Sequence, residues 1–201
     1  MQRILKRFFD ITSATITILV ISPLLILIAV LIKTTSAGPV LFAQERVGKN
    51  GKLFRIYKFR SMIENAHRLG AGLYMDGEND SRITKVGKFL RKTSLDELPE
   101  LFNVLKGEMS FVGPRPTLKY QVDKYSELQL RRLDILPGIT GWAQINGRNE
   151  IPWSKRIELD IWYIDNYSLW LDIKILILTL PSVLSSRGIS HQQNENDVDD
   201  L

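Results

Sequence analysis

Residues 11–32 read ITSATITILVISPLLILIAVLI, and none of these side chains is charged. The run matches the length of about 20 apolar residues that a helix needs to cross a bilayer. A secretory signal with a cleavage site at Thr35-Ser36-Ala37 is the alternative, but the apolar core of a signal is usually only about 7 to 15 residues long. The segment therefore predicts a helix that inserts into a membrane.

The middle of this segment contains Ser22-Pro23. A proline inside a helix lacks an N–H group, and its ring clashes with the carbonyl four residues earlier, here that of Leu19, so the helix must bend or break. Basic residues flank both ends of the segment: Lys6 and Arg7 before it, Lys33 and Arg46 after it. A single crossing usually shows a charge difference instead. Two topologies remain open, a kinked helix that spans the membrane and a re-entrant hairpin with both ends in the cytoplasm.

The chain has 201 residues, of which 44% are hydrophobic and 24% charged, and a formal net charge of +5. This length suits one domain of about 100 to 200 residues with an appendage. We expect a membrane anchor over residues 1–35, a globular domain over 36–188 and a disordered acidic tail over 189–201. The positive charge favours anionic partners, which include nucleic acid, anionic lipids and phosphorylated substrates.

The sequence contains no cysteine, which excludes a disulfide framework, a thiolate zinc site and a cysteine nucleophile. The two histidines, His67 and His191, argue against a multi-histidine metal centre or a Ser-His-Asp triad. Neither the phosphate-binding loop pattern nor the dinucleotide glycine fingerprint occurs. We therefore expect any catalysis to depend on carboxylates, arginines and lysines.

The segment after the anchor has short strand signals and longer helical ones. Turn residues around 40–42 and 53–57 predict a short β-hairpin, and a helix is expected at about 61–69. Residues 153–184 alternate amphipathic helical and apolar stretches, and they contain three of the four tryptophans. These aromatics suit either the headgroup zone of a membrane or a domain core. The expected fold class is α+β and mostly helical, with interfacial amphipathic helices.

Two adjacent carboxylates, Asp96 and Glu97, lie at an expected helix start. Ser94 and Glu97 have the spacing of a capping box, and Gly107 would end the helix. The unpaired N–H groups of a first turn favour negative charge, so both carboxylates should stay ionised. Mg²⁺ uses carboxylate oxygens alongside substrate phosphates, and one carboxylate could also attack phosphorus. A purely capping role for the pair is the alternative.

Four basic residues lie in short motifs on both sides of this pair: Lys58, Arg60, Arg91 and Arg115. Phosphoryl transfer needs cations that neutralise the charge on phosphoryl oxygens. Arg115 stands between two prolines, which restrict the backbone and can hold its guanidinium ready for bidentate phosphate binding. A surface turn is the alternative interpretation of this tripeptide.

These motifs resemble the bacterial sugar transferase family, the small monotopic phosphoglycosyl transferases, over nearly the whole chain. The resemblance lies in four segments, whose order and spacing agree: KFRSM at 58–62, LRKTSLDELP at 90–99, FVGPRP at 111–116 and PGITGWAQ at 137–144. It implies a re-entrant helix broken at Ser22-Pro23. It also implies a catalytic domain on the cytoplasmic face of the bacterial inner membrane, and dependence on Mg²⁺.

The resemblance further implies a reaction and the residues that perform it. A sugar 1-phosphate would pass from a UDP-sugar to undecaprenyl phosphate with release of UMP, as a first membrane step of glycoconjugate biosynthesis. Asp96 would be the nucleophile that carries a covalent phosphosugar, and Glu97 would assist with the metal or a proton. By the same resemblance, Arg91 and Arg115 match phosphate-binding positions of the family. Lys58 and Arg60 match a basic motif of the family.

Two other classes of function are the alternatives, and the first of them is consistent with the charge and the anchor. A noncatalytic membrane adaptor would use the basic surface to bind anionic lipid or a partner, and it should tolerate replacement of Asp96 by asparagine. A nucleic-acid-binding module is disfavoured, because the basic residues cluster beside the apolar segment and no recognition motif appears. The pattern specifies neither the sugar, the glycan pathway nor an oligomeric state.

Overall fold

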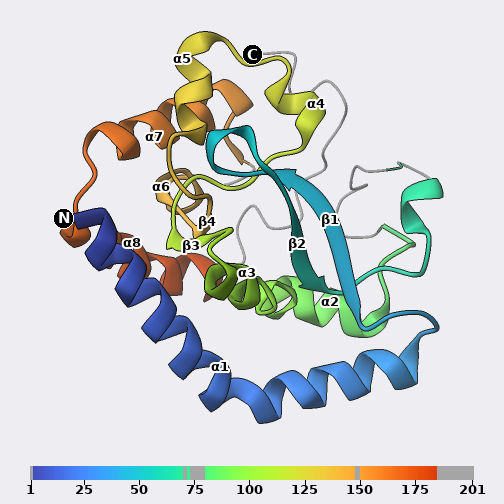
Figure 1. Ribbon diagram of the computed structural model, residues 1–201. Coiled ribbons are helices and arrows are strands. Elements are labelled where there is room, and N and C mark those ends of the chain that lie inside the picture. The colour runs from blue at the N-terminus through green and yellow to red at the C-terminus, as the bar shows by residue number, and fades with distance from the viewer. Residues whose placement is uncertain (1, 70–71, 73–79, 148–149, 185–201) are drawn as a thin grey trace.

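The computed structural model of the protein describes residues 2–69, 72, 80–147 and 150–184. The expected tail over 189–201, which includes His191, lies outside the described residues. The described chain is mostly helical with two two-stranded sheets, which confirms the α+β class. Figure 1 shows α1 (Gln2–Thr35) along the lower edge of the molecule, and the hairpin of β1 (Leu41–Val47) and β2 (Leu53–Phe59) above it.

Helix α1 contains the apolar segment and is the one helix among the described residues that is long and apolar enough to cross a membrane. Pro23 lies inside it, and the helix bends sharply midway (Figure 1). The Ser22 hydroxyl donates to the carbonyl of Leu19 at 2.9 Å, which satisfies a group that Pro23 leaves without its usual donor. The expected bend is confirmed, but α1 continues as one helix through this point and is not split in two.

Both halves of α1 pack against the same globular body. In the first half, Ala14 is fully buried among Leu101, Val104 and neighbouring apolar side chains. In the second half, Ile28 and Ile32 are buried in a different cluster. A helix of this length extends about 50 Å when straight, so the bend is what allows both halves to reach one domain.

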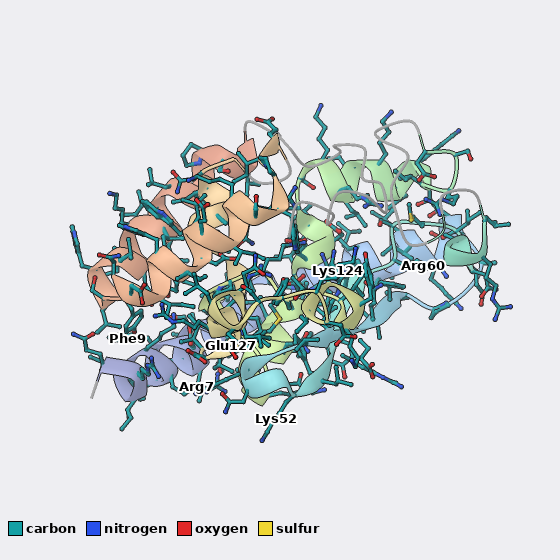
Figure 2. All side chains as sticks on the ribbon, turned by 90° about the horizontal axis from the view of Figure 1, so that it is seen from above. Arg7, Phe9, Lys52, Arg60, Lys124 and Glu127 are labelled. Atoms are coloured by element: carbon teal, nitrogen blue, oxygen red, sulfur yellow. The ribbon has the colours of Figure 1, made fainter. Side chains whose placement is uncertain are left out.

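Polar contacts fasten the two ends of α1. Near the start, Arg7 donates to the carbonyl of Val104 at 2.6 Å, and Asp10 accepts from the backbone N–H of Phe111 at 3.2 Å. Beyond the other end, the Arg60 guanidinium donates to the carbonyl of Ser36 at 2.9 Å. Figure 2 shows Arg7 and Arg60 well apart on the domain. The anchor is therefore held at both ends.

The expected hairpin is confirmed and is longer than the sequence indicated. β1 and β2 pair antiparallel from Leu41 opposite Phe59 to Val47 opposite Leu53. The expected helix over 61–69 is wrong: these residues form an isolated bridge from Met62 to Ile83 and a 3₁₀ turn, η2 (Ala66–Arg68), which is preceded by Asn65 in the left-handed region at φ 58°. A residue with positive φ interrupts a right-handed helix, so the helical pattern does not propagate.

The segment around the carboxylate pair forms α2 (Lys85–Lys92), the 3₁₀ turn η3 (Leu95–Glu97) and α3 (Glu100–Lys106). The expected end at Gly107, which adopts φ 84°, is confirmed, whereas the residues around Asp96 form a 3₁₀ turn and the α-helix begins at Glu100, one residue after the expected range of 95–99. The capping box is wrong, because Ser94 has φ 56° and its side chain makes no capping hydrogen bond.

A second sheet was not expected from the sequence. β3 (Ser110–Val112) pairs in parallel with β4 (Gly138–Thr140), and two glycines allow the close approach. A Cβ on Gly138 would lie 2.1 Å from the backbone nitrogen of Gly113, and a Cβ on Gly113 would lie 2.4 Å from the carbonyl oxygen of Leu136. The pair draws the chain that follows Val112 toward the centre of the domain.

The rest of the chain is helical. The charged stretch after Pro116 and the later part of the chain form these elements: α4 (Lys119–Val122), α5 (Glu127–Leu130), η4 (Arg131–Leu133), α6 (Trp142–Ile145), α7 (Trp153–Asp165) and α8 (Leu169–Leu184). None of the four tryptophans is fully buried, and Trp162 is 44% exposed, so the choice between a headgroup zone and a domain core stays a prediction. The rings of Trp142 and Trp162 stack with centroids 4.9 Å apart, whereas Trp170 on α8 is 73% exposed beside other exposed apolar side chains.

We predict that Gly138→Ala destabilises the protein by about 1 to 3 kcal/mol or more, because the added Cβ meets backbone that cannot move aside. Thermal unfolding in detergent measures this, and each kcal/mol lowers the midpoint by roughly 2 to 4 °C in a chain of this size. Gly51→Asn is the control, since Gly51 has φ 74° but open space around it. Equal midpoints for the two variants would contradict the role of Gly138.

Candidate active site

All six residues that the sequence singles out line one cavity of about 870 Å³: Lys58, Arg60, Arg91, Asp96, Glu97 and Arg115. They come from four segments of the chain. Lys58 lies on β2, and Arg60 directly follows that strand. Arg91 lies on α2, and Asp96 and Glu97 lie on η3. Arg115 lies in the loop after β3. Thr17 of α1 and Thr179 and Val183 of α8 also line the cavity, so the site lies next to the anchor.

Glu97 is the centre of the charged contacts. Lys58 donates from Nζ to Oε1 of Glu97 at 2.5 Å, and the Arg115 guanidinium donates to the same carboxylate. Burial alone would raise the pKa of Glu97, but the charges and hydrogen bonds of Arg115 and Lys58 outweigh burial and hold that pKa well below its usual range. Glu97 is therefore ionised and already neutralised by the protein.

Asp96 has a different environment, although it is the adjacent residue. Burial raises the pKa of Asp96 to about 6, even though the charges of Lys58 and Arg91 act to lower it. Among the described residues, none donates a hydrogen bond to this carboxylate. At neutral pH Asp96 is thus mostly ionised and open to a ligand, as a nucleophile must be.

Arg60 and Arg91 differ in what they contact. Arg60 is 6% exposed and donates to both the carbonyl and the hydroxyl of Ser36, so it joins the cavity wall to the end of α1. Burial lowers the pKa of Arg91, and the charge of Asp96 acts in the opposite direction. Arg91 is thus within electrostatic reach of Asp96, and the role of both arginines toward a substrate stays a prediction.

Charged residues near the carboxylate pair that were missed in the sequence include Glu100 and Arg46. Glu100 is fully buried, its Oε1 lies 3.4 Å from Nζ of Lys58, and burial raises its pKa to about 7. Burial lowers the pKa of Arg46 to about 10, and the positive charge of Arg115 adds to that effect. Spacing could have found both, because residues three apart share a helix face, and residues 42, 44 and 46 share one face of β1.

The residues present fit the expected Mg²⁺. Magnesium is usually bound by one or two carboxylates together with substrate phosphates and water, so a large cluster of protein ligands is not required. The described residues contain no group of three or more acidic, histidine or cysteine side chains that could hold a metal. Asp96 has free oxygens for this purpose, whereas Glu97 would have to share its oxygens with Lys58 and Arg115.

Comparison with known proteins agrees with the motifs. The family described as bacterial sugar transferase matches residues 1–186. The uncharacterized sugar transferase EpsL of Bacillus subtilis is 48% identical over 186 residues, which cover 92% of this chain and 90% of EpsL. The UDP-glucose:undecaprenyl-phosphate glucose-1-phosphate transferase of Escherichia coli is 48% identical over 189 residues. The undecaprenyl-phosphate galactose phosphotransferase of Salmonella typhimurium is 43% identical over 200 residues.

The coverage of these relatives differs. The match covers 89% of this chain but 40% of the Escherichia coli protein, and 93% of this chain but 42% of the Salmonella protein. The chain thus spans less than half of these two relatives and nearly all of EpsL. The match to the family over 1–186 includes the anchor and the whole described site, and this chain belongs to the bacterial sugar transferase family.

Proposed function

We propose that this protein transfers a sugar 1-phosphate from a UDP-sugar to undecaprenyl phosphate and releases UMP, as a membrane step of bacterial glycan biosynthesis. The observation that carries the proposal is the asymmetric carboxylate pair. Glu97 is neutralised by Lys58 and Arg115, and Asp96 beside it is ionised without a donor from the described residues. The names of the relatives support the donor and acceptor, because they are undecaprenyl-phosphate sugar phosphotransferases.

The reaction has two displacements at phosphorus. A carboxylate oxygen of Asp96 attacks the β-phosphorus of the donor, a P–O bond to the aspartate forms, and the bond from that phosphorus to the bridging oxygen breaks, so UMP leaves with the electron pair. An oxygen of undecaprenyl phosphate then attacks the same phosphorus. The aspartyl P–O bond breaks, Asp96 regains its charge, and the product is a lipid diphosphosugar.

The cations of the cavity stabilise the charge that develops on the phosphoryl oxygens, which is the main requirement of phosphoryl transfer. Arg115 and Lys58 already lie at Glu97, next to the nucleophile. Mg²⁺, held by Asp96 and Glu97 together with the substrate, would supply further neutralisation as a Lewis acid. Arg91 and Arg60 complete the positive wall in this proposal.

The contacts of α1 support a re-entrant anchor. Both ends of α1 are fixed to one globular body, through Arg7 at the start and Ser36 after the end. A helix that crossed the bilayer would separate these two ends by the hydrocarbon thickness of about 30 Å, with the domain on both sides. We therefore propose that both ends lie on the cytoplasmic face of the inner membrane, where nucleotide sugars occur.

A membrane adaptor remains the second candidate, favoured by the basic charge and the anchor alone. It does not account for two adjacent half-buried carboxylates in one cavity, of which Asp96 has a raised pKa, because such perturbed groups in a cavity are typical of binding and catalytic sites.

The anchor topology can be tested with single cysteines, since the chain has none of its own. Cysteines placed at Gln2 and at Asn50 should both react with a maleimide only from the cytoplasmic side of oriented vesicles. Pro23→Leu should shift the balance toward a spanning helix, because it restores a backbone bond whose loss costs about 3 kcal/mol or more. Labelling of Gln2 from the periplasmic side in the unaltered helix would refute the re-entrant anchor.

The covalent step can be trapped by omitting the lipid. Incubation with Mg²⁺ and UDP-glucose, UDP-galactose or UDP-N-acetylgalactosamine should release UMP once per enzyme and add one phosphosugar to the peptide that contains Asp96, as seen by mass spectrometry. Undecaprenyl phosphate should then remove the adduct.

Asp96→Asn should abolish adduct and turnover, because an amide is a poor nucleophile. Glu97→Gln should slow both steps but keep the attachment point. Asp123→Asn is the control, since Asp123 forms an exposed pair with Lys119. Release of UMP that requires donor and lipid together, with no adduct, would replace this mechanism by direct transfer.

The pH dependence follows from the raised pKa of Asp96. The carboxylate is the reactive form, so the rate of adduct formation should fall as the pH drops through about 6 and reach a plateau above it. Rapid-quench measurement of UMP between pH 5 and 8 tests this. Glu100→Gln removes the neighbouring group that titrates near 7, and the fall near 6 should persist in that variant. A rate that is flat from pH 5 to 8 in both proteins would exclude Asp96 as the titrating nucleophile.

A further inference from the structure

The backbone around Arg115 is held through its carbonyl groups. The two flanking prolines have no N–H to donate, so the segment cannot be fixed by its own donors at those positions. Donors come instead from three other parts of the chain. The N–H of Gly138 donates to Pro114, the guanidinium of Arg132 donates to Arg115, and the N–H of Val47 donates to Thr117, each at 2.9 Å.

Arg132 is the side-chain member of this set. It lies on η4, is 4% exposed, and uses its guanidinium in three directions. Besides the Arg115 carbonyl, it donates from Nε to Oδ2 of Asp160 and from NH1 to the hydroxyl of Tyr125, both at 2.6 Å. It also lies 5.5 Å from the ring centre of Trp153. A planar fork with donors engaged on three sides has little freedom to rotate.

Two of the four partners of Arg132, Asp160 and Trp153, come from one face of α7. Trp153 and Asp160 are seven residues apart, so they lie on the same side of the helix two turns apart. Asp160 is 1% exposed, and its ion pair with Arg132 is buried. Both residues line the same cavity as the carboxylate pair. A path of direct contacts therefore runs from α7 through Arg132 to the main chain of Arg115, and from its guanidinium to Glu97.

The guanidinium of Arg115 has few other restraints. Its hydrogen bonds to described residues all go to Glu97, and its side chain is 40% exposed. A phosphate that enters the cavity would compete for these same donors. Once a phosphate has displaced Glu97, the position of the Arg115 guanidinium depends on the position of the Arg115 main chain. The hydrogen bonds to the carbonyls of this segment, including the bond from Arg132, fix that main chain.

We propose that Arg132 is a positioning residue for Arg115, that Asp160 holds Arg132 in place, and that α7 thereby sets where the phosphate-binding guanidinium lies. The inference rests on the proposed function, in which Arg115 binds the phosphoryl group. This role differs from a purely structural one. If the ion pair of Arg132 and Asp160 only stabilised the fold, its loss would reduce activity by the same factor with Arg115 present or replaced.

A double-mutant cycle separates the two roles. Arg132→Lys keeps a positive charge but cannot engage three directions, and it should slow adduct formation at saturating donor by about 10- to 100-fold, as misplacement of a binding group by about 1 Å can. In the Arg115→Lys background the same change should cost less than about 3-fold, because the group that Arg132 positions is gone. Arg131→Lys is the matched control, since Arg131 also pairs with α7, through exposed Asp165, and does not contact Arg115. Its rate should be unchanged.

Each outcome decides between the possibilities. Equal fold-losses from Arg132→Lys in both backgrounds, or no loss in either, would overturn the positioning role. Near-normal activity of Arg115→Lys alone would instead show that Arg115 does not bind the phosphate, which is a failure of the proposed function. If Arg132→Lys does not fold, as judged by its thermal transition, Asp160→Asn carries the same cycle, because the amide keeps its shape and one acceptor oxygen for Nε. It should give a smaller loss that again disappears without Arg115.

Discussion

Burial disfavours charge on a carboxylate, and this protein places two of them side by side in one cavity. Glu97 keeps its charge because Lys58 and Arg115 donate to it from distant parts of the chain. These two donors are brought to Glu97 by the tertiary fold. Strand β2 places Lys58 beside η3, and the pairing of β3 with β4 places Arg115 there. The need to compensate this charge explains why the hairpin, the second sheet and α3 converge at the same point.

The same strand that serves the site also holds the anchor. Successive side chains of a strand point to opposite faces, so Lys58 reaches Glu97 from one face of β2 while Phe59, the next residue, lies on the other face. Phe59 is buried in the cluster that contains Ile28 and Ile32 of α1. A displacement of the second half of α1 would therefore be transmitted to Lys58 through one peptide bond.

The sequence predicted the parts of this structure that depend on local signals. The apolar run, the bend at Pro23, the hairpin and the helix end at Gly107 each follow from residue types within a few positions. The four motifs also predicted six residues that share one cavity. The pairing of β3 with β4 was missed, because each strand is three residues long and its partner is distant in the chain. Arg132 was missed for a similar reason, since the carbonyl of Arg115 becomes its partner only after folding.

The failure of the capping box shows how long-range contacts override a local preference. A serine cap contributes about 1 kcal/mol, whereas a hydrogen bond to a charged group contributes about 1.5 to 3 kcal/mol. Glu97 accepts such bonds from both Lys58 and Arg115. These bonds are stronger than the capping hydrogen bond that its side chain would make to a backbone N–H at the helix start. Ser94 then adopts a left-handed conformation and makes no side-chain cap, and the first turn is a 3₁₀ turn. Because consecutive residues on such a turn point in different directions, only one of the two carboxylates can reach both cations. The other, Asp96, is left charged and without a described donor, and its proposed role as the nucleophile depends on this asymmetry.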